Sequence, residues 1–306
     1  MTFTRRSFLV RGLSATLPLV GAGSILAACG GSSGSSSTAT SAPGTPGGGG
    51  GTGIPDGGWT LVQRFPNTSL VPGRVRLPLS LADTSGTLVT AGPEQLSGRI
   101  ADIDGAVVAE LTAQRHSIGD GAPLYWTFET ELDTPGIYAL DVEGSAGMPA
   151  AFQLFDPAEV PIPSAGQPLP GFDTPTTDDA RGVDPICTLS PDPCPFHAVT
   201  LTEALTLGTP VVYLIGTPAH CATGTCGPGL EFLVDIAGDY DGRVTIVHAE
   251  VYADDAATEI APAVTAIGTD YEPLLFITDG DGVVRERIDI VWDTDELRAA
   301  LDRNLA

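Results

Sequence analysis

Short segments in which apolar and polar residues alternate follow one another from residue 59 to residue 157, and turn-forming residues separate them. Alternation with a period of two is typical of strands that bury one face. The segments predicted to form strands are 59–65, 75–81, 96–103, 106–115, 124–132, 136–142 and 150–155. Seven short strands at this spacing predict an all-β sandwich, and Asp104-Gly105 between two of them predicts a hairpin turn.

From about residue 184 the apolar residues follow a different pattern, with helical periods and continuous runs. The helices predicted here are 201–207, 226–240, 257–267 and 294–305, and the predicted strands are 210–216, 244–251, 273–278 and 283–290. After the first short helix the order is βαβαββα, which predicts an α/β domain with a parallel strand pair and a final antiparallel hairpin around 279–282. Asp293 followed by Glu296 predicts a capping box at the start of the last helix.

Two stretches of biased composition flank the first of these regions. Residues 29–58 are almost wholly Gly, Ser, Thr, Ala and Pro, and such a segment cannot bury enough apolar surface to fold, so we expect a flexible tether. Residues 158–183 begin with a Pro-rich stretch and predict a second, stiffer linker. The expected folded domains are therefore 59–157 and 184–306.

The first thirty residues combine two motifs. Arg5-Arg6-Ser7-Phe8-Leu9, followed by a mildly apolar stretch without acidic residues, resembles a twin-arginine export signal. The stretch ends in Leu26-Ala27-Ala28-Cys29-Gly30, which resembles the lipobox of bacterial lipoproteins. The resemblance implies that residues 1–28 are a signal peptide, that Cys29 becomes the lipid-modified first residue, and that the protein is tethered to the outer face of the cell membrane.

Composition excludes several classes of function. The 306 residues carry 14 basic and 38 acidic side chains, a net charge of −24, and such a chain would repel a nucleic acid. Outside the first 30 positions no apolar run reaches the roughly 20 residues of a membrane-spanning helix, so a channel or transporter is not expected.

The segment 134–138 (Thr-Pro-Gly-Ile-Tyr) resembles the tyrosine-corner region of immunoglobulin-like domains. This resemblance implies an immunoglobulin-like sandwich over residues 59–157, which we interpret as a spacer or a protein-binding module. His116 lies in a turn rich in Ser, Gly and Asp, and we expect it to be a solvated loop residue rather than a ligand.

The order of elements in the C-terminal region, with a pair of cysteines between the first strand and the next helix, resembles a thioredoxin-like domain over about residues 200–306. Cys221-Ala-Thr-Gly-Thr-Cys226 occupies the position of the redox loop, and Glu272-Pro273 matches the family's segment with a cis-proline. The resemblance implies thiol–disulfide exchange at Cys221 and Cys226, with Pro273 shaping the substrate groove. Protein thiols and disulfides of the cell envelope are the partners that this chemistry implies.

The chain departs from that family in three respects. Four residues separate the two cysteines where the family has two, and His220 stands where the family has Trp. A protonated His220 would favour a thiolate at Cys221, whereas the carboxylate of Glu272 near the sulfurs would disfavour it. In one register Cys221 attacks and Cys226 resolves the mixed disulfide; in the other Cys226 is the nucleophile.

The remaining cysteines, Cys187 and Cys194, are separated by a short Pro-rich stretch. Their spacing predicts a structural disulfide that pins this segment, and the alternative is a second redox pair that relays electrons to the first. No cofactor and no resident metal are expected.

Two other functions compete with thiol–disulfide exchange. In one, the thioredoxin-like domain is a non-catalytic binding scaffold and both cysteine pairs are structural. In the other, His248 joins the pair Cys221 and Cys226 to handle copper, as in copper-delivering members of the thioredoxin fold. The sequence leaves the oligomeric state open.

Overall fold

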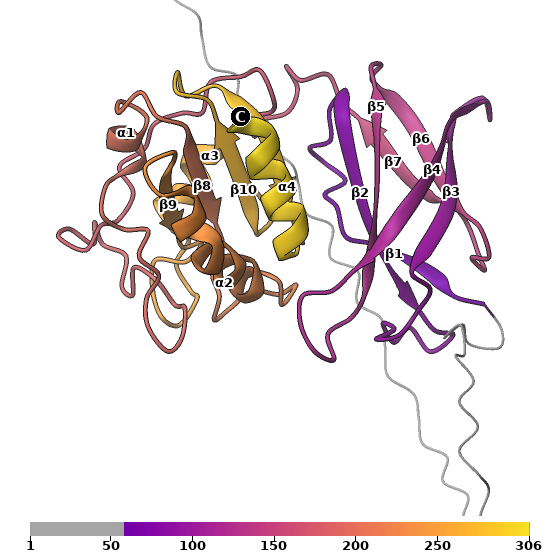
Figure 1. Cartoon of the computed structure of the whole chain (residues 1–306), viewed down its shortest axis with the longest axis horizontal. Helices are drawn as coiled ribbons and strands as arrows, with labels where there is room; N and C mark the ends of the chain where they lie inside the picture. The colour runs from indigo at the N-terminus through magenta and orange to yellow at the C-terminus, as the bar shows by residue number, and fades with distance from the viewer. Residues whose placement is uncertain (1–57, 306) are drawn as a thin grey trace, which may run out of the picture. The chain divides into compact units, whose positions relative to one another are not determined.

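The computed structural model describes residues 58–305 (Figure 1). The predicted signal peptide, Cys29 and nearly all of the predicted tether lie outside the described residues. None of the helices in residues 58–305 has the length and apolar character needed to span a bilayer.

Seven strands in the first part form one large antiparallel sheet, with the order β1-β2-β5-β4-β3-β6-β7. They are β1 (Thr60–Gln63), β2 (Gly73–Ala82), β3 (Gln95–Asp102), β4 (Val107–His116), β5 (Tyr125–Leu132), β6 (Gly136–Val142) and β7 (Ala150–Leu154). Each predicted strand is confirmed to within a few residues. The predicted turn at Asp104-Gly105 joins β3 and β4, and Gly105 adopts the positive φ of 83° that this turn requires.

The strand β4 joins the two halves of this sheet, which are β1-β2-β5 and β3-β6-β7. Val107 and residues 109–114 pair with β3, and the last two residues, Arg115 and His116, pair with β5. Buried side chains from both halves, among them Leu77 on β2, Phe128 on β5 and Leu140 on β6, pack into one core. In the segment that resembles a tyrosine corner, the Tyr138 hydroxyl donates to the Thr134 carbonyl at 2.8 Å.

The second part is a small α/β unit with a four-stranded sheet in the order β11-β10-β8-β9. Its strands are β8 (Val211–Ile215), β9 (Thr245–Ala249), β10 (Leu274–Thr278) and β11 (Val284–Asp289), and its helices are α1 (Leu201–Ala204), α2 (Cys226–Ala237), α3 (Pro262–Ile267) and α4 (Thr294–Asn304). A 3-10 turn, η1 (Gly238–Tyr240), follows α2. The parallel pair β8–β9 and the antiparallel hairpin β10–β11 are both as predicted.

Helices cover both faces of this sheet. On β8, Val211, Tyr213 and Ile215 pack with α1 and α3, whereas Val212 and Leu214 pack with α2 and α4. Side chains alternate between the faces of a strand, so a continuous apolar run is buried on both sides. This is the physical reason why the run PVVYLIG forms the central strand (Figure 1).

The segment 158–183, predicted to be a Pro-rich linker, packs on the α/β part of the chain. Val160, Ile162 and Leu169 belong to the core under α1 and α3. The backbone N–H of Leu169 donates to Gly282 O at 2.9 Å, and that of Val284 donates to Gln167 O at 2.9 Å. The segment therefore runs along the start of β11, because its scattered apolar residues are enough to cover the edge of the small sheet.

Two local expectations are corrected. The third helix begins at Pro262 rather than near residue 257, because proline is favoured at the first turn of a helix, and the residues before it form a loop held by Asp254. His116 is not a solvated loop residue: it ends β4, and its Nδ1 lies 2.8 Å from Asp293 Oδ2.

Candidate functional site

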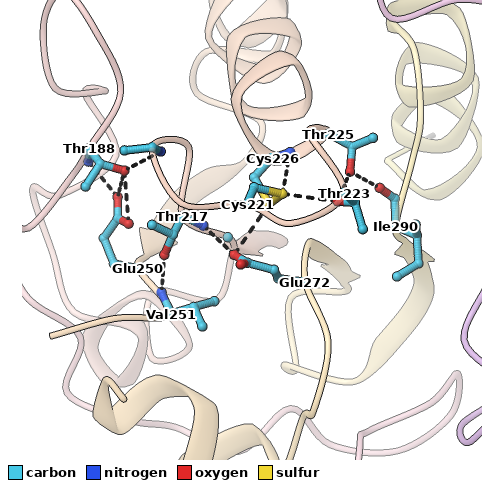
Figure 2. The surroundings of a disulfide bond; sticks show 12 residues. Thr188, Thr217, Cys221, Thr223, Thr225, Cys226, Glu250, Val251, Glu272 and Ile290 are labelled. Atoms are coloured by element: carbon cyan, nitrogen blue, oxygen red, sulfur yellow. Dashed lines mark hydrogen bonds between the residues drawn. A yellow bond between two sulfur atoms is a disulfide. The ribbon is translucent and has the colours of Figure 1, made fainter. Parts of the chain in front are cut away.

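Cys221 and Cys226 form a disulfide in the loop between β8 and α2, with their Cα atoms 5.9 Å apart (Figure 2). Cys226 is the first residue of α2 and is fully buried, whereas Cys221 is half-buried. The two sulfurs therefore differ in access. Cys221 is the more accessible sulfur, and Cys226 is shielded from solvent.

The N-terminus of α2 faces the sulfur of Cys221. The backbone N–H of Cys226 donates to Cys221 Sγ at 3.2 Å. The first N–H groups of a helix have no partner within it, and the helix dipole places partial positive charge there. Negative charge on Cys221 Sγ is therefore stabilised when the disulfide opens.

A chain of hydroxyls leads from Cys221 into the protein. Thr225 Oγ1 donates to the Ile290 carbonyl at 2.5 Å, and Thr223 Oγ1 lies 2.7 Å from Thr225 Oγ1 and 3.1 Å from Cys221 Sγ (Figure 2). A hydroxyl has one proton. Thr225 donates its only hydroxyl proton to the Ile290 carbonyl, so the Thr223 hydroxyl must donate to Thr225 Oγ1. Thr223 Oγ1 can then only accept a hydrogen bond on the side of Cys221. This chain suits a protonated Cys221 thiol, and stabilisation of a thiolate comes from the helix N–H.

Glu272 lies against the buried sulfur. Its Oε2 accepts the Thr217 backbone N–H at 2.7 Å and lies 3.4 Å from Cys226 Sγ (Figure 2). Burial raises the pKa of this carboxyl, and the Thr217 hydrogen bond only partly opposes that effect. The sequence predicted a carboxyl group near the sulfurs, and the structure places it at Cys226.

Pro273 follows a cis peptide bond with Glu272, as predicted, and is buried. A Cβ at Gly216 would lie 3.2 Å from Pro273 Cβ and 3.5 Å from Cys226 Sγ. The end of β8, the cis-proline and the disulfide therefore meet at a point where a side chain larger than hydrogen would crowd its neighbours.

Among the described residues, no hydrogen bond joins His220 to the sulfur of Cys221 or of Cys226. It is exposed, its Nε2 lies 2.9 Å from the Asp255 carbonyl oxygen, and its ring meets Tyr252 edge-on. A residue directly before a cysteine in sequence need not point toward it, and here the loop turns the ring toward 252–255.

A depression of about 390 Å³ adjoins the loop that carries Cys221, at Ala222 and Thr223. Its lining includes Thr223 and Glu272 from the surroundings of the disulfide, together with the apolar or aromatic residues Tyr252, Ile260 and Tyr271. Ile260 is 57 % exposed and contributes apolar surface to this depression. The depression offers an apolar surface directly beside Cys221.

The predicted disulfide between Cys187 and Cys194 is corrected by the structure, in which both are free and buried. Two histidines lie against them instead. Cys194 Sγ is 3.3 Å from His197 Nε2 and 3.5 Å from His248 Nδ1. His248 thus lies beside this pair and not beside Cys221 and Cys226, where the copper hypothesis placed it.

Sequence reasoning missed His197 altogether. A local signal was available, because Cys187, Cys194 and His197 lie within eleven residues of one another. The fourth member, His248, lies on β9 and reaches the group only through the fold.

Thr188 and Glu250 form hydrogen bonds close to the Cys221–Cys226 disulfide (Figure 2). Thr188, next to Cys187, donates its backbone N–H to Glu250 Oε1 at 2.6 Å and accepts the Ala219 N–H on its hydroxyl at 3.1 Å. Burial raises the pKa of Glu250, and the nearby His248 opposes this. The segment around Cys187 is therefore tied by a hydrogen bond to the loop that carries Cys221.

Comparison with models of protein families finds no match, and comparison with curated proteins finds no significantly similar sequence.

Proposed function

We propose that this protein is a membrane-tethered, extracytoplasmic thiol–disulfide oxidoreductase whose C-terminal domain is thioredoxin-like and acts through Cys221 and Cys226. The observation that carries the proposal is a disulfide at the N-terminus of α2 with one half-buried and one fully buried sulfur. The strand order β11-β10-β8-β9 and the cis bond before Pro273 support the fold assignment. The hydrogen bond from Tyr138 to Thr134 supports an immunoglobulin-like sandwich as the first domain.

The proposed chemistry assigns each sulfur a role. In the reduced protein the Cys221 thiolate attacks a substrate disulfide and forms a mixed disulfide, releasing one substrate sulfur as a thiolate. Cys226 then gives its proton to the Glu272 carboxylate 3.4 Å away and attacks Cys221 Sγ. The second substrate sulfur leaves as a thiolate, and the two substrate thiolates take up one proton from Glu272 and one from solvent. Two electrons have passed to the substrate from the cysteine pair; the reverse sequence oxidises a substrate dithiol.

The surroundings suit an extended protein segment as substrate. The depression beside the redox loop is lined by Tyr252, Ile260 and Tyr271, and it would take an apolar side chain next to the substrate cysteine. Partners are accordingly envelope or secreted proteins that carry disulfides. Attachment to the membrane through Cys29 would keep the domain near such proteins.

Trapping tests this function directly. In Cys226→Ser the mixed disulfide on Cys221 cannot be resolved, so we expect covalent adducts with envelope proteins that dithiothreitol releases. The control is Cys221→Ser, which should trap little because Cys226 is fully buried. Adducts on Cys221→Ser alone would reverse the roles of the two cysteines.

The reduction potential provides a second measurement on the same bond. Catalytic pairs have potentials of about −270 to −120 mV, and structural disulfides typically lie below about −300 mV. We expect the Cys221–Cys226 pair to lie in the first range. Absence of adducts together with a potential below that range would leave a binding scaffold with a structural disulfide.

A further inference from the structure

A buried group of four side chains lies apart from the disulfide: Cys187, Cys194, His197 and His248. Their exposed fractions are 4 %, 6 %, 1 % and 0 %, respectively. One donor atom from each lies within 4.8 Å of each of the others. Cysteine and histidine side chains gathered in this way are the ligands that proteins use for zinc.

The distances within the group match a tetrahedron around one ion. Zinc lies about 2.3 Å from sulfur and about 2.0–2.1 Å from nitrogen, so tetrahedral ligands are about 3.3 Å apart for two nitrogens and about 3.6 Å apart for nitrogen and sulfur. The structure has 3.3 Å between His248 Nδ1 and His197 Nε2. Cys194 Sγ lies 3.3 and 3.5 Å from the same two nitrogens.

Hydrogen bonds orient two members of the group, His248 and Cys187, as ligands. His248 Nε2 lies 2.9 Å from the Gly216 carbonyl oxygen, which only accepts, so the proton of this ring is on Nε2 and the lone pair of Nδ1 faces the group. The backbone N–H of Cys194 donates to Cys187 Sγ at 3.3 Å, as expected for a sulfur that carries negative charge.

Charge balance also favours a divalent cation. Binding of the ion releases one proton from each of two thiols, and two thiolates with one dication form a neutral site, which can be fully buried at low cost. Without a cation, two imidazole nitrogens and two sulfurs would face one another in a space shielded from water.

We propose that Cys187, Cys194, His197 and His248 form a closed, structural Zn²⁺ site. All four positions are taken by protein side chains, so no position remains for a substrate or water, as is typical of structural zinc. The site would fasten the segment 184–199, which has no helix or strand, to His248 on β9. Through Thr188 it would also support the redox loop at Ala219.

Metal analysis of the purified full-length chain tests the site. We expect one zinc per chain, and at least a tenfold loss of bound zinc in Cys194→Ser and in His248→Ala. The double variant Cys221→Ser/Cys226→Ser is the matched control: it removes the other cysteine pair and should keep its zinc. Failure of thiol–disulfide exchange would leave these expectations unchanged.

Cobalt replacement in the wild-type chain guards against variants that do not fold. After removal of zinc and addition of Co²⁺ alone, we expect the intense visible bands of tetrahedral cobalt with thiolate ligands. Chelation should also lower the Tm of wild type, and Zn²⁺ alone should restore it. A Cys187–Cys194 disulfide in the isolated chain, a wild type that binds no Zn²⁺, or full zinc content in Cys194→Ser would overturn the proposal.

Discussion

Two effects act on the pKa of Glu272 in opposite directions. The Thr217 N–H at 2.7 Å favours the carboxylate, whereas burial favours the neutral acid and has the larger effect, so the pKa is raised. Cys226 Sγ lies 3.4 Å from the same oxygen. An ionised Glu272 makes a thiolate at Cys226 less favourable, and it is also placed to accept the proton of the Cys226 thiol.

Replacement of this carboxyl by an amide should change the acidity of Cys226. In reduced Glu272→Gln we expect the pKa of the Cys226 thiol to fall, because a neighbouring negative charge is lost. The measurement is the pH titration of the Cys226 Cβ signal by NMR, which needs no reagent to reach the buried sulfur. The matched control is Glu231→Gln, an exposed carboxyl on the same helix α2. An equal pKa in wild type and Glu272→Gln would contradict the role given to this carboxyl.

Helix α2 places the disulfide by packing on Trp292. A Cβ at Gly229 would lie 2.8 Å from Trp292 Cζ2, and the indole Nε1–H donates to the Gly229 carbonyl at 3.3 Å. Glycine at this position lets the first turn of the helix, which carries Cys226, approach the segment between β11 and α4. Nothing in the helical pattern of the sequence indicates this close contact.

Gly229→Ala should therefore lower the free energy of unfolding by about 1–3 kcal/mol, since added volume in a close-packed site forces neighbours apart. Urea unfolding measures this. Gly238→Ala at the other end of α2 is the control: its φ of −60° suits alanine, and no atom lies within 4 Å of the added Cβ. We expect that variant to be unchanged or up to ~1 kcal/mol more stable. Equal effects at the two glycines would contradict this packing argument.

All the described residues belong to one compact unit, and a group of partly buried polar side chains links its large sheet to its α/β part. Asp293 caps α4 by accepting the Glu296 N–H at 2.9 Å, as predicted. The Glu296 side chain does not complete the predicted capping box; it instead accepts from Tyr125 at 2.5 Å and Arg76 at 2.7 Å. His116 lies 2.8 Å from Asp293.

This group makes stability depend on pH. Burial disfavours a charged His116, but Asp293 and Glu296 outweigh burial and raise its pKa. The His116 contribution is therefore full below the unfolded pKa of about 6.5 and is lost as the pH rises through the higher folded value. For Asp293, burial is outweighed by His116 and the Glu296 N–H, so its pKa is lowered and its contribution is full above about 3.9. Both are complete between these two pH values.

We expect wild type to lose stability relative to His116→Gln as the pH rises from 5 to 8. At pH 5 the substitution should cost about 1.5–3 kcal/mol, the range for a hydrogen bond to a charged group. Urea unfolding across this pH range gives the difference. His220→Gln is the control, since His220 is exposed and its ring nitrogen contacts a backbone carbonyl. A difference that does not vary with pH would show that His116 is not charged in the folded protein.

Local patterns in the sequence determined the helices and strands and the pairing of Cys221 with Cys226. Strand and helix periods are properties of neighbouring residues, and a loop of a few residues between Cys221 and Cys226 keeps their sulfurs close whatever the rest of the chain does. The order of elements also determined the parallel pair β8–β9 and the final hairpin, because few topologies satisfy short, right-handed connections.

Contacts between residues distant in sequence depended on the fold. His248 reaches Cys194 across 54 positions and His116 reaches Asp293 across 177, and no local period encodes such approaches. The spacing of Cys187 and Cys194 predicted a disulfide, and the structure has two free thiols instead. The prediction failed because sequence separation does not show which side chains pack against the two sulfurs. The sequence determined which reactive and metal-binding side chains are present. The packing of helices and strands decided which of them share a buried space.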